Sequence, residues 1–198
     1  MINQGTLQIQ NRIKARALIT GIVTVFILGF LFWEHFHGGV ASHHILYQQN
    51  LPAISNWWSG LLLPILTWLL ISRTEKRLGK QCSQVQQTNN LQRMVLRLFV
   101  TGIVLGISIA TSFTNGYSLF LDNVLYIILV LSLIIPIYYS EFMLGFILGM
   151  TYTFGAILPT VFILILAAIG IFTYRLIRPI IMRLIIGFIN NLSKSPNR

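Results

Sequence analysis

Residues 142–174 read FMLGFILGMTYTFGAILPTVFILILAAIGIFTY and contain no charged side chain. A single helix of this length would extend about 50 Å at 1.5 Å per residue, whereas the hydrocarbon core of a bilayer is about 30 Å thick. A single helix would also put the basic C-terminal residues on the opposite side of the membrane from all other basic residues. We therefore predict two short membrane helices, residues 138–157 and 158–176, with a hinge near Pro159.

The composition of the whole chain supports a membrane location. The sequence is 55% hydrophobic and 9% charged, with a mean hydropathy of +0.76, whereas soluble domains carry about 25% charged residues. A surface that faces water cannot be built from so few charged side chains. The chain is therefore predicted to be a multi-pass integral membrane protein in which residues 1–198 form one domain.

Four further apolar runs complete the predicted fold. They span residues 17–33, 53–72, 98–114 and 123–137, and the second run contains Pro64, where a kink is expected. We interpret the first run as a retained helix, because no small-residue cleavage site of a signal peptide directly follows it. Beyond the last helix, residues 179–191 are expected to lie as an amphipathic segment in the inner interface. The prediction is an all-α bundle of six transmembrane helices.

The basic residues predict how this bundle is oriented. The formal net charge is +10, and with six membrane helices all 14 lysine and arginine residues fall on one side. Because Lys and Arg are enriched on the cytoplasmic side, we expect both termini and the basic, amide-rich loop 73–97 at the cytoplasmic face of the cell's inner (plasma) membrane. These residues are expected to contact anionic lipid head groups. They are not combined with aromatic residues on a solvated face, which argues against nucleic-acid binding.

The polar residues of the outer side gather around one predicted loop, residues 34–52. The candidate metal ligands in this loop are His35, His37, His43 and His44. Neutral imidazole is a common ligand of zinc and related divalent ions. Glu34 and Asp122 are candidate catalytic residues, since a carboxylate can orient an imidazole or act as a general base. Because water bound to such a metal is a nucleophile, the loop raises the hypothesis of a metal-dependent membrane hydrolase.

Three other interpretations of the histidine loop stay open. The histidines could respond to the outside pH, because their charge changes between about pH 5 and 8. They could line the vestibule of an ion, proton or small-solute transporter, or they could be purely structural and fasten the loop to the following helix. The polar side chains available for a transport path are Ser108, Thr111, Ser112, Thr151 and Thr153. No haem, retinal or nucleotide cofactor is expected, since no histidine or lysine lies inside a predicted helix.

Two GxxxG spacings and one unusual acid predict contacts within the membrane. The first spacing is Gly102 and Gly106, and the second is Gly145 and Gly149. Such spacings let helix backbones approach closely in lipid, so they are also candidate faces for a homo-oligomer. Glu141 is one of only four acidic residues, and we expect it to snorkel or to pair with a basic residue near an inner turn.

The segment around the histidines also carries a resemblance. Glu34-His35-Phe36-His37-Gly38-Gly39, Ser42-His43-His44, Leu51-Pro52 and Ser55-Asn56-Trp57-Trp58 resemble a family of small bacterial multi-pass membrane proteins. This resemblance covers about a quarter of the chain and implies a membrane location, but no particular activity. There is a looser similarity to the membrane-embedded metal hydrolases that include alkaline ceramidases. This chain lacks their late histidine pair and has too few predicted helices, so their site residues are not carried over.

Overall fold

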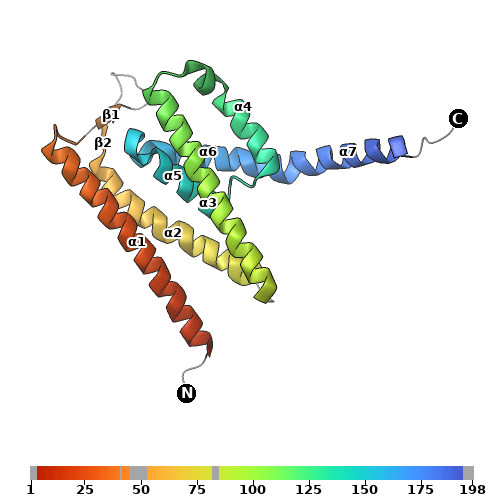
Figure 1. The fold of residues 1–198 in the computed structure, drawn as a ribbon, viewed down its shortest axis with the longest axis horizontal. Helices are drawn as coiled ribbons and strands as arrows, with labels where there is room; N and C mark the ends of the chain where they lie inside the picture. The colour runs from red at the N-terminus through yellow and green to blue at the C-terminus, as the bar shows by residue number, and fades with distance from the viewer. Residues whose placement is uncertain (1–3, 41, 45–52, 82–84, 194–198) are drawn as a thin grey trace.

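The computed structural model describes residues 4–40, 42–44, 53–81 and 85–193, and nearly all of them are helical (Figure 1). The helices are α1 (Gln4–Phe36), α2 (Trp57–Gln81), α3 (Val85–Thr114), α4 (Ser118–Ile134), α5 (Ser140–Phe154), α6 (Ile157–Phe172) and α7 (Arg178–Ser193). A π-helical turn, η2 (Thr173–Ile177), joins α6 to α7. Two short strands, β1 (Ser42–His44) and β2 (Ala53–Ser55), pair in antiparallel register between α1 and α2. The predicted all-α class is confirmed.

In the described part of the chain, three helical stretches are long and apolar enough to cross a membrane: Gln10–Phe36, Asn90–Thr114 and Ile157–Gly187. Their outward faces are apolar, as shown by Val25 and Phe26 of α1, which are 73% and 75% exposed. Large apolar side chains in such number are unfavourable in water but favourable against lipid tails. These features agree with the predicted membrane location.

The predicted division of residues 138–176 into two helices is confirmed, but the break lies elsewhere. It falls at Gly155, whose φ of +68° is in the left-handed region that favours glycine. Gly155 directly follows α5, a position where glycine commonly ends helices. Pro159 lies inside the first turn of α6, where its missing N–H costs no helical hydrogen bond.

Two predicted boundaries were wrong because helices continue past the apolar runs that indicated them. The loop expected at 73–97 is mostly helical, since α2 extends to Gln81 and α3 begins at Val85. The helix expected to end at 176 continues without a break from Ile157 to Ser193. The expected amphipathic segment is therefore the end of this long helix, and α7 extends away from the other helices (Figure 1).

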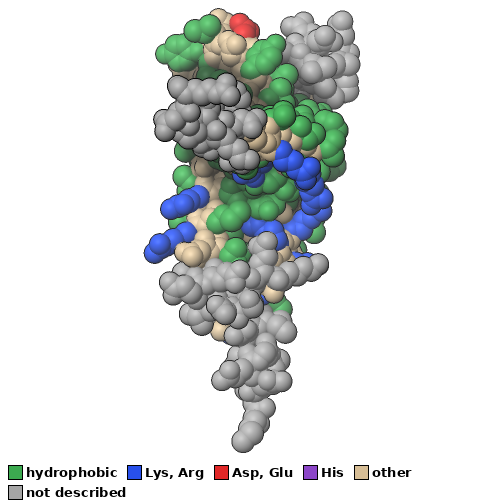
Figure 2. All heavy atoms as spheres, turned by 90° about the vertical axis from the view of Figure 1, so that its right-hand side faces the viewer, with side chains coloured by type: hydrophobic (Ala, Val, Ile, Leu, Met, Phe, Trp, Pro, Cys, Tyr) green, Lys and Arg blue, Asp and Glu red, His purple; other side chains and the backbone are tan. Residues whose placement is uncertain are grey.

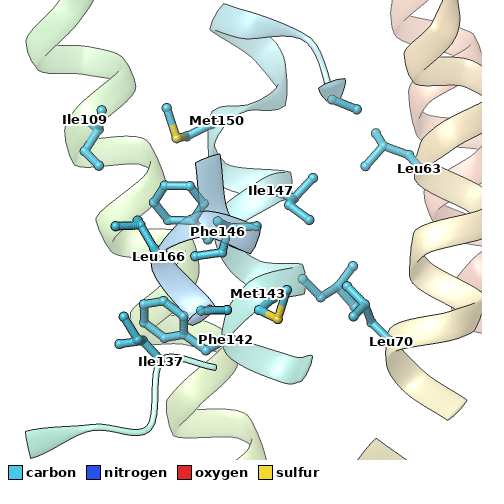
Figure 3. Packing of buried hydrophobic residues seen from close by; sticks show 14 of the residues in the cluster. Leu63, Leu70, Ile109, Ile137, Phe142, Met143, Phe146, Ile147, Met150 and Leu166 are labelled. Carbon is cyan, nitrogen blue, oxygen red and sulfur yellow. The ribbon is translucent and has the colours of Figure 1, made fainter. Parts of the chain in front are cut away.

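Helix α5 lies at the centre of the structure, and most of its residues are buried. Its side chains point in opposite directions toward different neighbours (Figure 3): Met143 and Ile147 toward Leu63 and Leu70 of α2, and Phe146 toward Leu166 of α6. Phe146 is fully buried. One short, buried helix thus holds together elements from both halves of the chain.

The remaining face of α5 packs directly on the backbone of α3. A Cβ atom placed on Gly106 would lie 2.7 Å from the Phe146 carbonyl oxygen, and one placed on Gly149 would lie 2.7 Å from the Ile103 carbonyl oxygen. A Cβ atom on Gly102 would come even closer to the Phe142 carbonyl oxygen, and one on Gly145 even closer to the Phe99 carbonyl oxygen. Since residue numbers rise together along the contact, α3 and α5 run parallel. The GxxxG faces therefore meet within one chain, and a homo-oligomer through them stays a prediction.

Replacing Gly145 with alanine is expected to destabilise the protein. The new methyl group would clash with the Phe99 backbone, which cannot rotate away, and overpacking of this kind costs about 1–3 kcal/mol. Gly29→Ala in α1 is the matched control, because nothing lies within 4 Å of its Cβ position. Thermal unfolding in detergent should show a lower midpoint for Gly145→Ala alone; equal midpoints would contradict the close α3–α5 contact.

Candidate functional site

A chain of polar contacts joins three elements at the predicted outer end of the bundle. Asn56, directly before α2, donates from Nδ2 to Glu34 Oε2 of α1 at 3.2 Å. Ser59 donates to Asn56 Oδ1 at 2.6 Å and accepts from the backbone N–H of Ala156 at 2.8 Å. Asn56 and Ser59 are 3% and 1% exposed. This outer network therefore ties α1 and α2 to the turn between α5 and α6.

The described histidine side chains lie against aromatic rings rather than around one point. The His37 ring stacks on Trp33 at 4.8 Å, and its Nδ1 is 2.8 Å from the Trp33 carbonyl oxygen. A carbonyl oxygen can only accept, so the Nδ1–H of His37 donates this hydrogen bond. His35 lies near the rings of Phe36 and Trp57. These contacts agree with the structural interpretation of the loop.

The other predicted ligands are placed only in part. The β1–β2 pairing sets His43 opposite Ile54 and His44 opposite Ala53, while their side chains and residues 45–52 lie outside the described part of the chain. Asp122 is exposed on α4, and no described contact joins it to Glu34 or to a histidine. Among the described side chains, no three His, Cys, Asp or Glu residues come together as a metal site. A three-ligand centre at this end would need His43 or His44.

At the opposite end of the bundle, which is predicted to be the inner end, an ion pair joins α5 to α2. Glu141, in the first turn of α5, is 4% exposed and pairs with Arg77 Nη2. Thr74 Oγ1 also donates to Glu141 Oε2 at 3.2 Å. The Arg77 guanidinium lies 3.8 Å above the ring centre of Tyr139, a favourable cation–π arrangement. The expectation that Glu141 pairs with a basic residue is confirmed.

This ion pair borders a cavity of about 450 Å³. Its polar lining is Arg73, Thr74, Arg77, Tyr138, Tyr139, Ser140, Glu141 and Arg175. Its apolar lining is Met143, Leu164, Ala167, Ala168 and Ile171. Three arginines and one glutamate make this inner cavity electropositive. Figure 2 shows Lys and Arg side chains gathered in the middle of one face, away from the acidic side chain at its top.

Arg77 has donors that the described residues do not satisfy. One nitrogen, Nη2, contacts Glu141, while Nε and Nη1 are buried and have no described hydrogen-bond partner. Burying an N–H donor without a partner costs about 1–3 kcal/mol, more when the group is charged. A buried donor without a partner calls for an explanation, such as a water or an ion that the chain itself does not provide.

A second cavity, of about 420 Å³, lies between α1, α2, α3 and α5 and is lined almost entirely by apolar side chains. Three of the five hydroxyl groups expected to form a transport path donate within their own helices. Ser108 and Thr111 donate to carbonyls of α3, and the buried Thr151 donates to the Ile147 carbonyl of α5. These hydroxyls therefore do not favour a polar path through the bundle.

One residue of the inner cavity could be singled out from the sequence, and it was not sufficient to predict the cavity. Glu141 stood out as an acid beside a long apolar run. Its partner Arg77 lies 64 residues earlier, and Arg175 comes from η2, after the end of α6. No local spacing connects these three positions, so only the folded structure brings them together.

Replacing Asn56 with alanine is expected to weaken the outer network. The change removes the donor to Glu34 and the acceptor of Ser59, and unpaired buried polar groups cost about 1–3 kcal/mol. Asn123→Ala is the matched control, because Asn123 is exposed and donates only to the Leu119 carbonyl of its own helix. Chemical unfolding in detergent should show lost stability for Asn56→Ala only. A loss of equal size in both variants would count against a network that joins elements.

Comparison with protein-family models, with curated proteins and with solved structures found no match to this chain. Its function is therefore inferred from its own residues.

Proposed function

We propose that this chain is a multi-pass protein of the bacterial cytoplasmic membrane that binds an anionic lipid head group in its inner cavity. The observation that carries the proposal is the pair of buried, unpaired Arg77 nitrogens beside a cavity that Arg73 and Arg175 also line. Basic pockets between membrane helices on the cytoplasmic side commonly receive lipid phosphates. A phosphate offers the acceptor oxygens that these donors lack.

The proposed topology has six crossings, α1 to α6, with both termini in the cytoplasm. It places the inner cavity on the side of the membrane where all 14 Lys and Arg residues are expected. Helix α5 has 15 residues, about 22 Å at 1.5 Å per residue, which is shorter than the hydrocarbon core. Its burial among other helices supports a role as a short inner crossing, because little of it would have to match the lipid thickness.

The position of the arginines favours a head group at the membrane interface. Arg73 and Arg77 are four residues apart and share one face of α2, and Arg175 lies across the cavity in η2. The backbone N–H groups at the start of α5 have no side-chain cap, and a helix N-terminus favours negative charge. In this proposal, the three arginines and the start of α5 all bind the same anion.

Arg73→Gln and Arg175→Gln are expected to weaken binding of an anionic lipid. Each change removes one cation from the cavity lining, and one basic residue near the membrane surface contributes about 1 kcal/mol, or about fivefold in affinity. Native mass spectrometry of the full chain with phosphatidylglycerol should measure this loss. Arg183→Gln is the control, because Arg183 lies on the exposed α7 and does not line the cavity. The proposal fails if the wild type retains phosphatidylglycerol no better than phosphatidylcholine, or if all three variants lose equally.

A divalent-metal site at the outer face is a second candidate, and the His37 tautomer favours it. Metal-bound imidazoles commonly donate their other N–H to a backbone carbonyl, as His37 does to Trp33. Nε2 of His37 is then available as a ligand, with His43 or His44 to complete a site. Zinc bound there would support the hydrolase hypothesis, whereas a loop without metal would leave pH response, transport or a purely structural role as the alternatives.

Elemental analysis of the purified protein tests this second candidate. We expect near-stoichiometric zinc in the wild type and its loss in both His37→Ala and His43→Ala, because each would remove a ligand. Asn123→Ala serves as the control, since it removes a polar side chain of α4 that contacts only its own helix. Wild-type protein without metal, with all variants folded, would exclude the metal-dependent hydrolase.

A further inference from the structure

We infer that the lipid of the inner cavity carries its phosphate as a doubly charged monoester, with a hydrocarbon chain along α6; this rests on the proposed function. The first argument is charge. Three arginines and one glutamate line the cavity, so its net charge is two positive units. A phosphate monoester carries about −1.5 to −2 at pH 7, whereas a diester carries only one negative charge. The monoester is therefore the better electrostatic match.

The second argument is the number of donors around the cavity. Nε and Nη1 of Arg77 lack partners, and Arg73, Arg175 and the uncapped start of α5 supply further N–H groups. A terminal phosphate presents three acceptor oxygens, and a diester presents two. Arginine also binds phosphate in a bidentate manner that fixes its orientation. The extra oxygen of a monoester would satisfy donors that a diester leaves unpaired.

The third argument distinguishes a lipid from a soluble phosphate ester. The residues of α6 that line the cavity are Leu164, Ala167, Ala168 and Ile171. Their spacing of three, four and seven residues puts them in one stripe on a single face of the helix. A hydrocarbon chain attached to the phosphate would cover this stripe. A soluble phosphate would leave it bare, so the cavity fits an amphipathic ligand.

The experiment compares lipids that differ only in the head group. The full chain, purified in a neutral detergent, is titrated with phosphatidic acid, phosphatidylglycerol and phosphatidylcholine of identical acyl chains, and bound lipid is counted by native mass spectrometry. We expect phosphatidic acid to bind at least about fivefold more tightly than phosphatidylglycerol. The second pKa of a phosphate monoester is about 6. The preference should therefore be present at pH 8 and shrink at pH 5, where the monoester has lost its second charge.

A double variant and a soluble competitor sharpen this test. Arg73→Gln combined with Arg175→Gln lowers the net charge of the lining from two to zero, so the preference for phosphatidic acid should disappear. Arg183→Gln, on the exposed α7, should keep it. Arg77 is left intact, because removing it would strand the buried Glu141 carboxylate. Glycerol 3-phosphate should displace phosphatidic acid only weakly, since it cannot cover the apolar stripe.

The outcomes separate this inference from the proposed function. Equal binding of phosphatidic acid and phosphatidylglycerol, both weakened by the double variant, would overturn the monoester inference and leave the lipid-binding proposal standing. Glycerol 3-phosphate that binds as tightly as phosphatidic acid would show a site for soluble phosphate esters and overturn the lipid assignment. Binding of no anionic lipid above phosphatidylcholine would overturn both.

Discussion

The contact between the glycine faces of α3 and α5 determines where most other elements lie. Gly102 and Gly106 of α3, and Gly145 and Gly149 of α5, each lie directly against the backbone of the other helix, which brings α5 to the centre of the structure. The other faces of α5 are then covered by α2 and α6. In lipid, hydrophobic burial does not drive helices together, so their association depends on close van der Waals packing of this kind. A methyl group at this contact would move α5 relative to every element that surrounds it.

The central position of α5 creates the need for polar contacts at both of its ends. Its first turn brings Glu141 into the interior, where a carboxylate is costly unless it is paired, and Arg77 of α2 supplies the charge. Its last residue is followed by Gly155 and Ala156, and the backbone N–H of Ala156 donates to the Ser59 hydroxyl of α2. Helix α2 therefore anchors both ends of α5, by an ion pair on one side and by hydrogen bonds on the other.

Periodicity and composition could predict the helical class and the division of the long apolar run, because both depend on local sequence. Periodicity and composition failed at the helix boundaries, because an apolar run shows which residues can lie in lipid and not where the hydrogen-bonded helix ends. Helix α2 extends into its charged segment as far as Gln81. The inner cavity was not predictable, because Arg77, Glu141 and Arg175 meet only through tertiary packing. The histidine loop was predicted to be a metal site because of the chemistry of its side chains, yet the described His35 and His37 contact aromatic rings.

The outer network and the inner cavity differ in whether their polar groups find hydrogen-bond partners within the chain. In the outer network, Asn56 and Ser59 each both donate and accept within the chain, so this network needs nothing from outside to be stable. In the inner cavity, Arg77 retains unpaired nitrogens beside two further arginines. The chain has 14 basic and only four acidic residues, so its own carboxylates cannot neutralise its basic side chains. In the proposed topology these side chains face the cytoplasm, where lipid phosphates are the nearest anions at the membrane surface.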